Sequence, residues 1–197
     1  MHAFILGKKT GMSQVWKDEK VIPVTVIKAA SNQIDMVRTA ERDGYDAIRL
    51  SAPAPVGRKR QRHEFRLSSA PSEEIKIGLD VSVSDFTPGD RVSVSGLSIG
   101  KGFQGVVKRH GFSGAKKTHG TKDQLRASGS IGAGGIQRVF KGMRMGGRMG
   151  GRKVTVKNLT VVAVNPDKNE LLIKGAVPGN RRTILAIRRL SSAPAQK

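Results

Sequence analysis

Cysteine is missing from this sequence, and acidic residues are scarce. The absence of cysteine among 197 residues excludes a disulfide framework, a thiolate nucleophile and a cysteine-ligated zinc site. Asp and Glu number 15 against 36 Lys and Arg, which leaves a formal charge of +21 at pH 7. A surface with this excess repels itself in isolation, so the chain is expected to bind a polyanion.

Long apolar runs are also missing. No stretch approaches the roughly 20 apolar residues that span a bilayer, and the opening residues MHAFIL do not resemble a secretory signal. An acidic membrane would favour an amphipathic helix or a lipid signal, and neither is visible. Nucleic acid is therefore the favoured polyanion, because basic side chains release its condensed counterions. We expect a cytoplasmic protein.

Short β-branched runs with period-two alternation predict strands in two parts of the chain. The predicted strands are 21–27, 45–50, 91–94, 154–164, 170–177 and 183–187. Turn residues such as Pro88-Gly89-Asp90 separate them, a pattern typical of a barrel or a sandwich. The length suits one domain with appendages. We expect residues 1–99 and 154–190 to share one core, with a basic insertion at 53–71 and a disordered tail at 191–197.

The segment 100–153 has a different composition. It holds fifteen of the 24 glycines, thirteen Lys or Arg, and Asp123 as its single acid. Its few apolar residues lack periodicity, and glycine loses the most backbone entropy on ordering. The segment is therefore predicted to build no core of its own and to gain order from nucleic acid.

Gly100-Lys101-Gly102-Phe103-Gln104-Gly105 spells the G-x-G-x-x-G pattern of dinucleotide-binding proteins. We reject that interpretation, because the pattern needs a full crossover helix and a second strand ending in an acid. A helix here could extend only over about 103–110. The match to an RNA-recognition motif is also weak, since Gly105 stands at its second aromatic position. The remaining interpretation is that the backbone of 100–105 approaches phosphates closely and that nearby cations supply positive charge.

Arg144-Met145-Gly146-Gly147 repeats as Arg148-Met149-Gly150-Gly151. A period of four would align the arginines on a helix, but paired glycines argue against one. An extended, flexible basic strip fits better, because guanidinium groups bind phosphates and stack on bases.

The four histidines predict no metal site, because only His110 and His119 lie near each other and lysines surround them. We interpret those two as RNA contacts. No nucleophile–histidine–acid set or carboxylate pair stands out, so no catalysis, cofactor or small-molecule substrate is expected. Lys8 and Lys9 are either solvated or face phosphates, and the sequence does not decide between the two.

The predicted RNA-contacting residues extend over most of the chain. They are Lys8, Lys9, Arg58, Lys59, Arg60, Lys101, Lys108, Arg109, His110, Lys116, Lys117, His119, Lys122, Arg126, Arg138, Lys141, Arg144, Arg148, Arg152 and Lys153.

Four blocks of the sequence resemble the bacterial form of large-subunit ribosomal protein three, the L-three family. They are LGKKTGMS with IPVTVI, then DGYDAI, then GLSIGKGFQGVVKR, and finally LLIKGAVPG. The third is the most specific, and THG, GSIG and VFKG continue it. Together they cover most of the chain, with 53–71 and the tail unmatched.

The resemblance implies a closed Greek-key β-barrel of the translation-protein type with a long, extended, Gly/Arg/Lys-rich internal extension. It also implies a structural role in the large ribosomal subunit, with ribosomal RNA and neighbouring ribosomal proteins as partners and a part in early assembly. The extension would point towards the peptidyl-transferase centre, with 101–122 and 141–153 as its arms. Its tip would be Gly129, Ser130, Ile131, Gly132, Ala133, Gly134, Gly135, Ile136, Gln137 and Arg138.

Two other classes of function stay open. One is a general nucleic-acid-binding protein or RNA chaperone, which would bind unrelated nucleic acids with similar strength. The other is a basic β-protein that acts on RNA as an enzyme, which would lose turnover when His110 or His119 is replaced.

Overall fold

The computed structural model describes residues 3–17, 19–53, 60–67, 70 and 75–191. Within these ranges strand residues far outnumber helical ones, so the expected mainly β class is confirmed. The chain forms two compact units, one made of residues 1–98 and 153–197 and the other of residues 99–152. No helix in the described ranges has the length and apolar character needed to cross a membrane.

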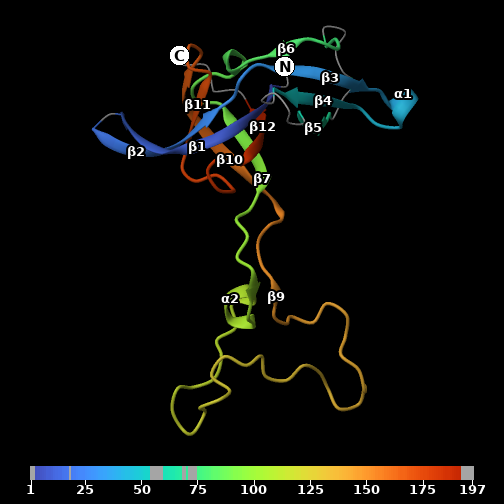
Figure 1. Cartoon of the computed structure of the whole chain (residues 1–197), viewed down its shortest axis with the longest axis vertical. Coiled ribbons are helices and arrows are strands. Elements are labelled where there is room, and N and C mark those ends of the chain that lie inside the picture. Colours follow the sequence, from blue (N-terminus) through green and yellow to red (C-terminus); the bar gives the residue numbers. More distant parts are fainter. Residues whose placement is uncertain (1–2, 18, 54–59, 68–69, 71–74, 192–197) are drawn as a thin grey trace. The chain divides into compact units, whose positions relative to one another are not determined.

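Six antiparallel strands of the first unit pair in a closed ring (Figure 1). They are β1 (Phe4–Lys17), β2 (Lys20–Lys28), β7 (Arg91–Leu97), β10 (Lys153–Asn165), β11 (Glu170–Lys174) and β12 (Ile184–Ser191). The pairing order is β1-β12-β7-β10-β11-β2, and β2 pairs back with β1. The last strand of the chain therefore lies between the first strand and β7.

The inside of the ring is an apolar core. Ile5, Ile27, Val94, Ile173 and Ile187 are all fully buried in one cluster. They come from five of the six strands and from both strand-rich parts of the sequence. Residues from both parts therefore pack in this one cluster. The predicted strands 21–27, 91–94, 154–164 and 183–187 also lie within or largely within ring strands.

A second, four-stranded sheet belongs to the same unit and has the order β5-β4-β3-β6. Its strands are β3 (Asn32–Arg38), β4 (Ala47–Ala52), β5 (Gln61–Arg66) and β6 (Asp80–Val81). The short helices α1 (Ala40–Asp43) and η1 (Val83–Asp85) complete this part of the chain. Phe4 and Leu6 of β1 pack in its core, while Ile5 packs inside the ring. Because β1 is buried on both faces, its start is apolar without alternation.

The structure differs from the sequence prediction at two places in the β region. Residues 53–71 are not only a basic insertion, because β5 lies there and pairs with β4 from Ala52↔Gln61 to Ala47↔Arg66. The sequence did not predict β5 because most of its residues are charged and Phe65 is its one buried side chain. Strand β12 extends to Ser191, one residue into the predicted tail. Residues 192–197 lie outside the described residues.

The second unit begins with a short two-stranded stem. Strand β8 (Phe103–Gln104) pairs with β9 (Gly147–Arg148), and the helix α2 (Val106–His110) follows β8 directly. The helix ends at Gly111, which adopts a left-handed conformation with a φ of 74°. Residues 129–146 are exposed throughout, and Val106 is the one buried apolar side chain among residues 99–152. The predicted lack of an extensive core is confirmed for this unit.

Candidate nucleic-acid interface

The stem of the second unit is fixed by its backbone. The amide of Lys101 donates to the carbonyl of Met149 over 2.9 Å, and the amide of Met149 donates to the carbonyl of Gly102 over 2.9 Å. These bonds extend the β8–β9 pairing towards the ends of the unit. The Arg-Met-Gly-Gly repeat thus forms part of one side of the two-stranded stem, and no part of it is helical.

One glycine of the repeat, Gly150, is required by close packing against backbone, and two others lie against side chains. A Cβ atom on Gly147 would lie 2.6 Å from Nη1 of Arg109, and one on Gly146 would lie 3.4 Å from the ring of Phe103. Gly150 has a φ of 73°, and a Cβ there would collide with the carbonyl oxygen of Ile99. Gly150 thus lets two backbone segments approach each other, a role that goes beyond the flexibility expected from the sequence.

Arg109 and His110 have contacts inside the unit, although the sequence predicted them to contact RNA. Arg109 Nη1 donates to the carbonyl oxygen of Met145 over 2.7 Å, and Nε2 of His110 lies 3.0 Å from the same oxygen. Because a carbonyl oxygen only accepts, the His110 ring must carry a proton on Nε2 to bond there. These two side chains therefore hold the arm that carries Met145.

Most other predicted RNA-contacting side chains of this unit are exposed. Those exposed are Lys101, Lys108, Lys116, Lys117, His119, Lys122, Arg126, Arg138, Lys141, Arg144, Arg148 and Arg152. None of the ion pairs found among the described residues involves the lysines of this unit. With Asp123 as the only acid, positive charge is in large excess in this unit.

The predicted tip, 129–138, is a turn without regular structure. Gly129 has a φ of 76°, and the hydroxyl of Ser130 donates to the carbonyl of Gly132 over 2.9 Å. Ile131 and Ile136 expose 42% and 48% of their surface. Apolar side chains this exposed, next to Arg138, are suited to contact another molecule.

The predicted RNA-contacting residues of the first unit differ in how exposed their side chains are. Lys8, Arg60 and Lys153 are exposed. Lys9 is half-buried, and its Nζ donates to the carbonyls of Val177 at 3.0 Å and Gly179 at 2.9 Å. Its ammonium group is thus bound within the protein, an arrangement that neither sequence interpretation anticipated. Arg58 and Lys59 lie outside the described residues.

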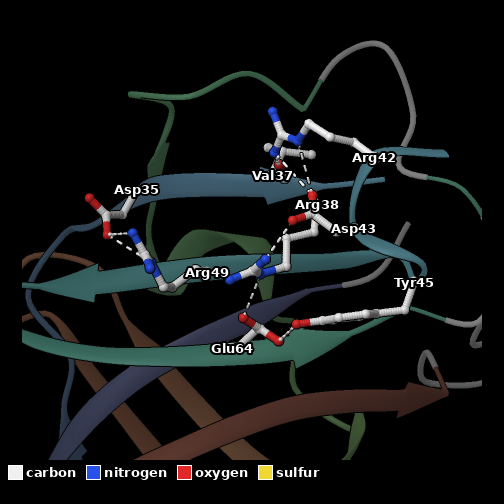
Figure 2. Close-up of polar contacts among 8 residues, drawn as sticks. All are labelled: Asp35, Val37, Arg38, Arg42, Asp43, Tyr45, Arg49 and Glu64. Atoms are coloured by element: carbon white, nitrogen blue, oxygen red, sulfur yellow. Dashed lines mark hydrogen bonds and ion pairs between the residues drawn. The ribbon is translucent and has the colours of Figure 1, made fainter. Parts of the chain in front are cut away.

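Three acids of the first unit, Asp35, Asp43 and Glu64, form ion pairs on or beside the four-stranded sheet. Figure 2 shows Arg38 between two carboxylates, 2.6 Å from Asp43 and 3.0 Å from Glu64. The Tyr45 hydroxyl donates to the other oxygen of Glu64 over 2.9 Å. Beside them, Asp35 accepts from Arg49 at 2.8 Å and from Arg62 at 3.1 Å.

These contacts lower the pKa values of two of the carboxylates. Burial alone would raise the pKa of Glu64, but hydrogen bonds from Tyr45 and Arg38 outweigh it and lower that pKa. Burial alone would likewise raise the pKa of Asp43, but the hydrogen bonds and charges of Arg42 and Arg38 together outweigh it and lower that pKa. Both carboxylates therefore stay ionised and compensate nearby arginines.

Comparison with known proteins identifies the family. The family model for ribosomal protein L3 matches residues 67–171, more than half of the chain. The chain belongs to the ribosomal protein L3 family. The matched L3 segment contains the whole second unit, so the exposed cations and the glycine repeat are part of what the family model describes.

Bacterial L3 proteins are similar to nearly the whole chain. The large ribosomal subunit protein uL3 of Acidothermus cellulolyticus is 43% identical, over 98% of this chain and 95% of that protein. The uL3 proteins of Clavibacter michiganensis and Streptococcus pyogenes are 45% and 41% identical, each over 93% of this chain. They cover 93% and 95% of those two proteins. The resemblance to bacterial L3 inferred from the sequence is confirmed.

Proposed function

We propose that this chain is a structural constituent of the large ribosomal subunit and binds large-subunit ribosomal RNA in the cytoplasm. The observation that carries the proposal is the accumulation of exposed cations in residues 99–152 of a chain in the L3 family. No catalysis is assigned to it. Neighbouring ribosomal proteins are its other partners, and it supports an early step of subunit assembly.

The proposed architecture is a Greek-key β-barrel of the translation-protein type with an inserted extension. The strand order supports the barrel, because β12 lies between β1 and β7 while β11 pairs with β2. The second unit is the extension, with 101–122 and 141–153 as arms. Its tip, residues 129–138, points towards the peptidyl-transferase centre.

The proposed binding mechanism combines a fixed stem with exposed charge. Arg109, His110 and the glycine contacts hold the two arms together at the stem. The lysines and arginines beyond it neutralise phosphates where RNA helices crowd together. Binding through about 6–10 phosphates is expected to weaken on the order of a thousandfold or more between about 50 and 200 mM salt.

Sedimentation of a cell lysate tests this proposal directly. The chain should travel with the large subunit and leave it only when the subunit is unfolded or stripped with high salt. Purified protein should also prefer large-subunit RNA to bulk RNA in competition. Similar affinity for both RNAs, together with absence from the subunit, would instead indicate a general nucleic-acid-binding protein or RNA chaperone.

A further inference from the structure

A surface pocket of the first unit is lined by cations from three chain segments. Lys8 comes from β1, Lys28 from β2, and Arg181 and Arg182 from the loop before β12. All four side chains are exposed. None of the described residues that line the pocket is acidic. None of the ion pairs within the described part of the chain involves these four cations.

Two of these cations face each other in the sheet. Lys8 and Lys28 are direct cross-strand partners in the antiparallel pair of β1 and β2. Like charges in this position destabilise a sheet, because their side chains share one face at short range. On its other side Lys28 is opposite Glu170 of β11, but these two side chains form no ion pair within 4.0 Å. The protein therefore keeps a repulsion that a bound anion would remove.

The loop that carries Arg181 and Arg182 is held to strand β1 by hydrogen bonds. The main-chain amide of Arg182 donates to the carbonyl of Lys9 over 2.7 Å, and the Lys9 amide donates to the carbonyl of Thr183 over 3.0 Å. The Lys9 ammonium holds the carbonyls of Val177 and Gly179 in the same loop. Lys9 is thus a positioning residue, and the cations beside it are held in place before any ligand binds.

Local backbone irregularities occur at the same place. Arg182 has a φ of 71°, a conformation that an L residue adopts only at a cost in energy. Strand β1 has a register shift between Lys9 and Gly11, and this bulge places Thr10 in the pocket lining. Bulges and strained residues concentrate at binding sites, where they direct side chains towards a ligand. Two small residues, Ala30 and Ala52, also line the pocket.

We propose that this pocket binds a backbone phosphate of large-subunit ribosomal RNA, as a second contact separate from residues 99–152. Four convergent donors suit a compact anion with several oxygens, and the small residues leave room for the sugar beside it. The assignment rests on the proposed function, since it requires ribosomal RNA as the partner.

The test uses a charge-matched pair of double variants of the full chain. K8Q/K28Q removes two pocket charges, and K157Q/K168Q removes two exposed lysines of the same unit outside the pocket. Binding of purified large-subunit RNA is measured against salt concentration. We expect K8Q/K28Q to bind about tenfold more weakly and its salt dependence to fall by about one phosphate equivalent. The RNA affinity of the control K157Q/K168Q should fall by about threefold or less.

Thermal unfolding of the free protein provides the second readout. K8Q/K28Q should be at least as stable as the natural sequence, because the cross-strand repulsion is gone, although it binds RNA less well. If its stability falls instead, R181Q/R182Q takes its place in the same comparison. A stable pocket variant that binds RNA as well as the control overturns the pocket assignment and leaves the proposed function intact.

Two further outcomes separate the alternatives. If the pocket variant binds RNA normally but no longer enters assembled subunits, the occupant is an acidic protein segment, and the phosphate assignment is wrong. If the natural sequence itself shows no preference for ribosomal over bulk RNA, the proposed function fails and the RNA pocket fails with it.

Discussion

Arg109 Nη1 donates a hydrogen bond of 2.7 Å to the main-chain oxygen of Met145, a residue 36 positions further along the chain. The same guanidinium lies against Gly147, where a Cβ atom would come within 2.6 Å of it. One side chain thus connects α2 to the returning arm through both a hydrogen bond and packing. Its contribution to RNA binding is expected to come through this connection as well as through its charge.

Replacing Arg109 with Gln should weaken RNA binding more than replacing its exposed neighbour Lys108 with Gln. Both changes remove one charge, but only the first removes the Met145 contact, which is worth about 1 kcal/mol in net terms. Filter binding with large-subunit RNA measures the affinities, and chymotryptic cleavage after Phe140 reports loosening of the free arm. Equal affinities and equal cleavage rates would show that Arg109 acts as a charge alone.

Gly150→Ala should open the stem of the second unit. The new methyl group would collide with the carbonyl of Ile99 at a φ of 73°, which should cost about 1–3 kcal/mol. Hydrogen exchange of the Lys101 and Met149 amides should accelerate, because both bonds flank this site. Gly134→Ala is the matched control, since no atom lies within 4 Å of a Cβ there. Unchanged exchange in Gly150→Ala would contradict the packing role.

The sequence predicted the strands of the ring because their alternation is local. The run 154–164 is rich in β-branched residues, and such a composition can be read within one short segment. The sharp change of composition at 100 and 153 was equally visible. Strand β5 was missed because Phe65 is its one buried side chain, so its sequence reads as a charged loop.

Contacts between distant positions could not be predicted in the same way. Lys9 binds carbonyls 168 and 170 residues away, and the Arg38–Glu64 pair joins separate strands. No local spacing encodes such pairs, because they depend on the register of the folded sheets. Arg181 and Arg182 were visible as a basic pair, but their neighbours Lys8 and Lys28 come together only in the closed ring.

Leu171→Ala should destabilise the first unit by about 2–5 kcal/mol. Leu171 is fully buried in the ring core, so truncation leaves a cavity in addition to the lost burial. Leu97→Ala is the control, because Leu97 exposes 57% of its surface and should change stability by about 0.5 kcal/mol or less. Urea unfolding followed by circular dichroism measures both. A similar loss in the two variants would contradict the assigned core.

Acidification should reduce the stability of the first unit below neutral pH, because of His63. Burial lowers the pKa of His63 from its ordinary value of 6.5, the charge of Lys153 lowers it further, and Glu64 opposes them. Between the lowered pKa and 6.5 the unfolded chain binds the proton while the folded chain does not, so stability rises with pH in that window. As pH falls through it, this contribution is lost.

His63→Gln should remove that dependence. Urea unfolding between about pH 5 and 7.5 should give a flatter stability profile for His63→Gln than for the natural sequence, whereas exposed His119→Gln should keep the natural slope. The pKa values of Asp43 and Glu64 are also lowered. Their contribution to the stability of the fold is lost only as pH falls below their ordinary pKa values of 3.8 and 4.5. The measured window therefore isolates the histidine. An unchanged slope in His63→Gln would show that another group titrates there.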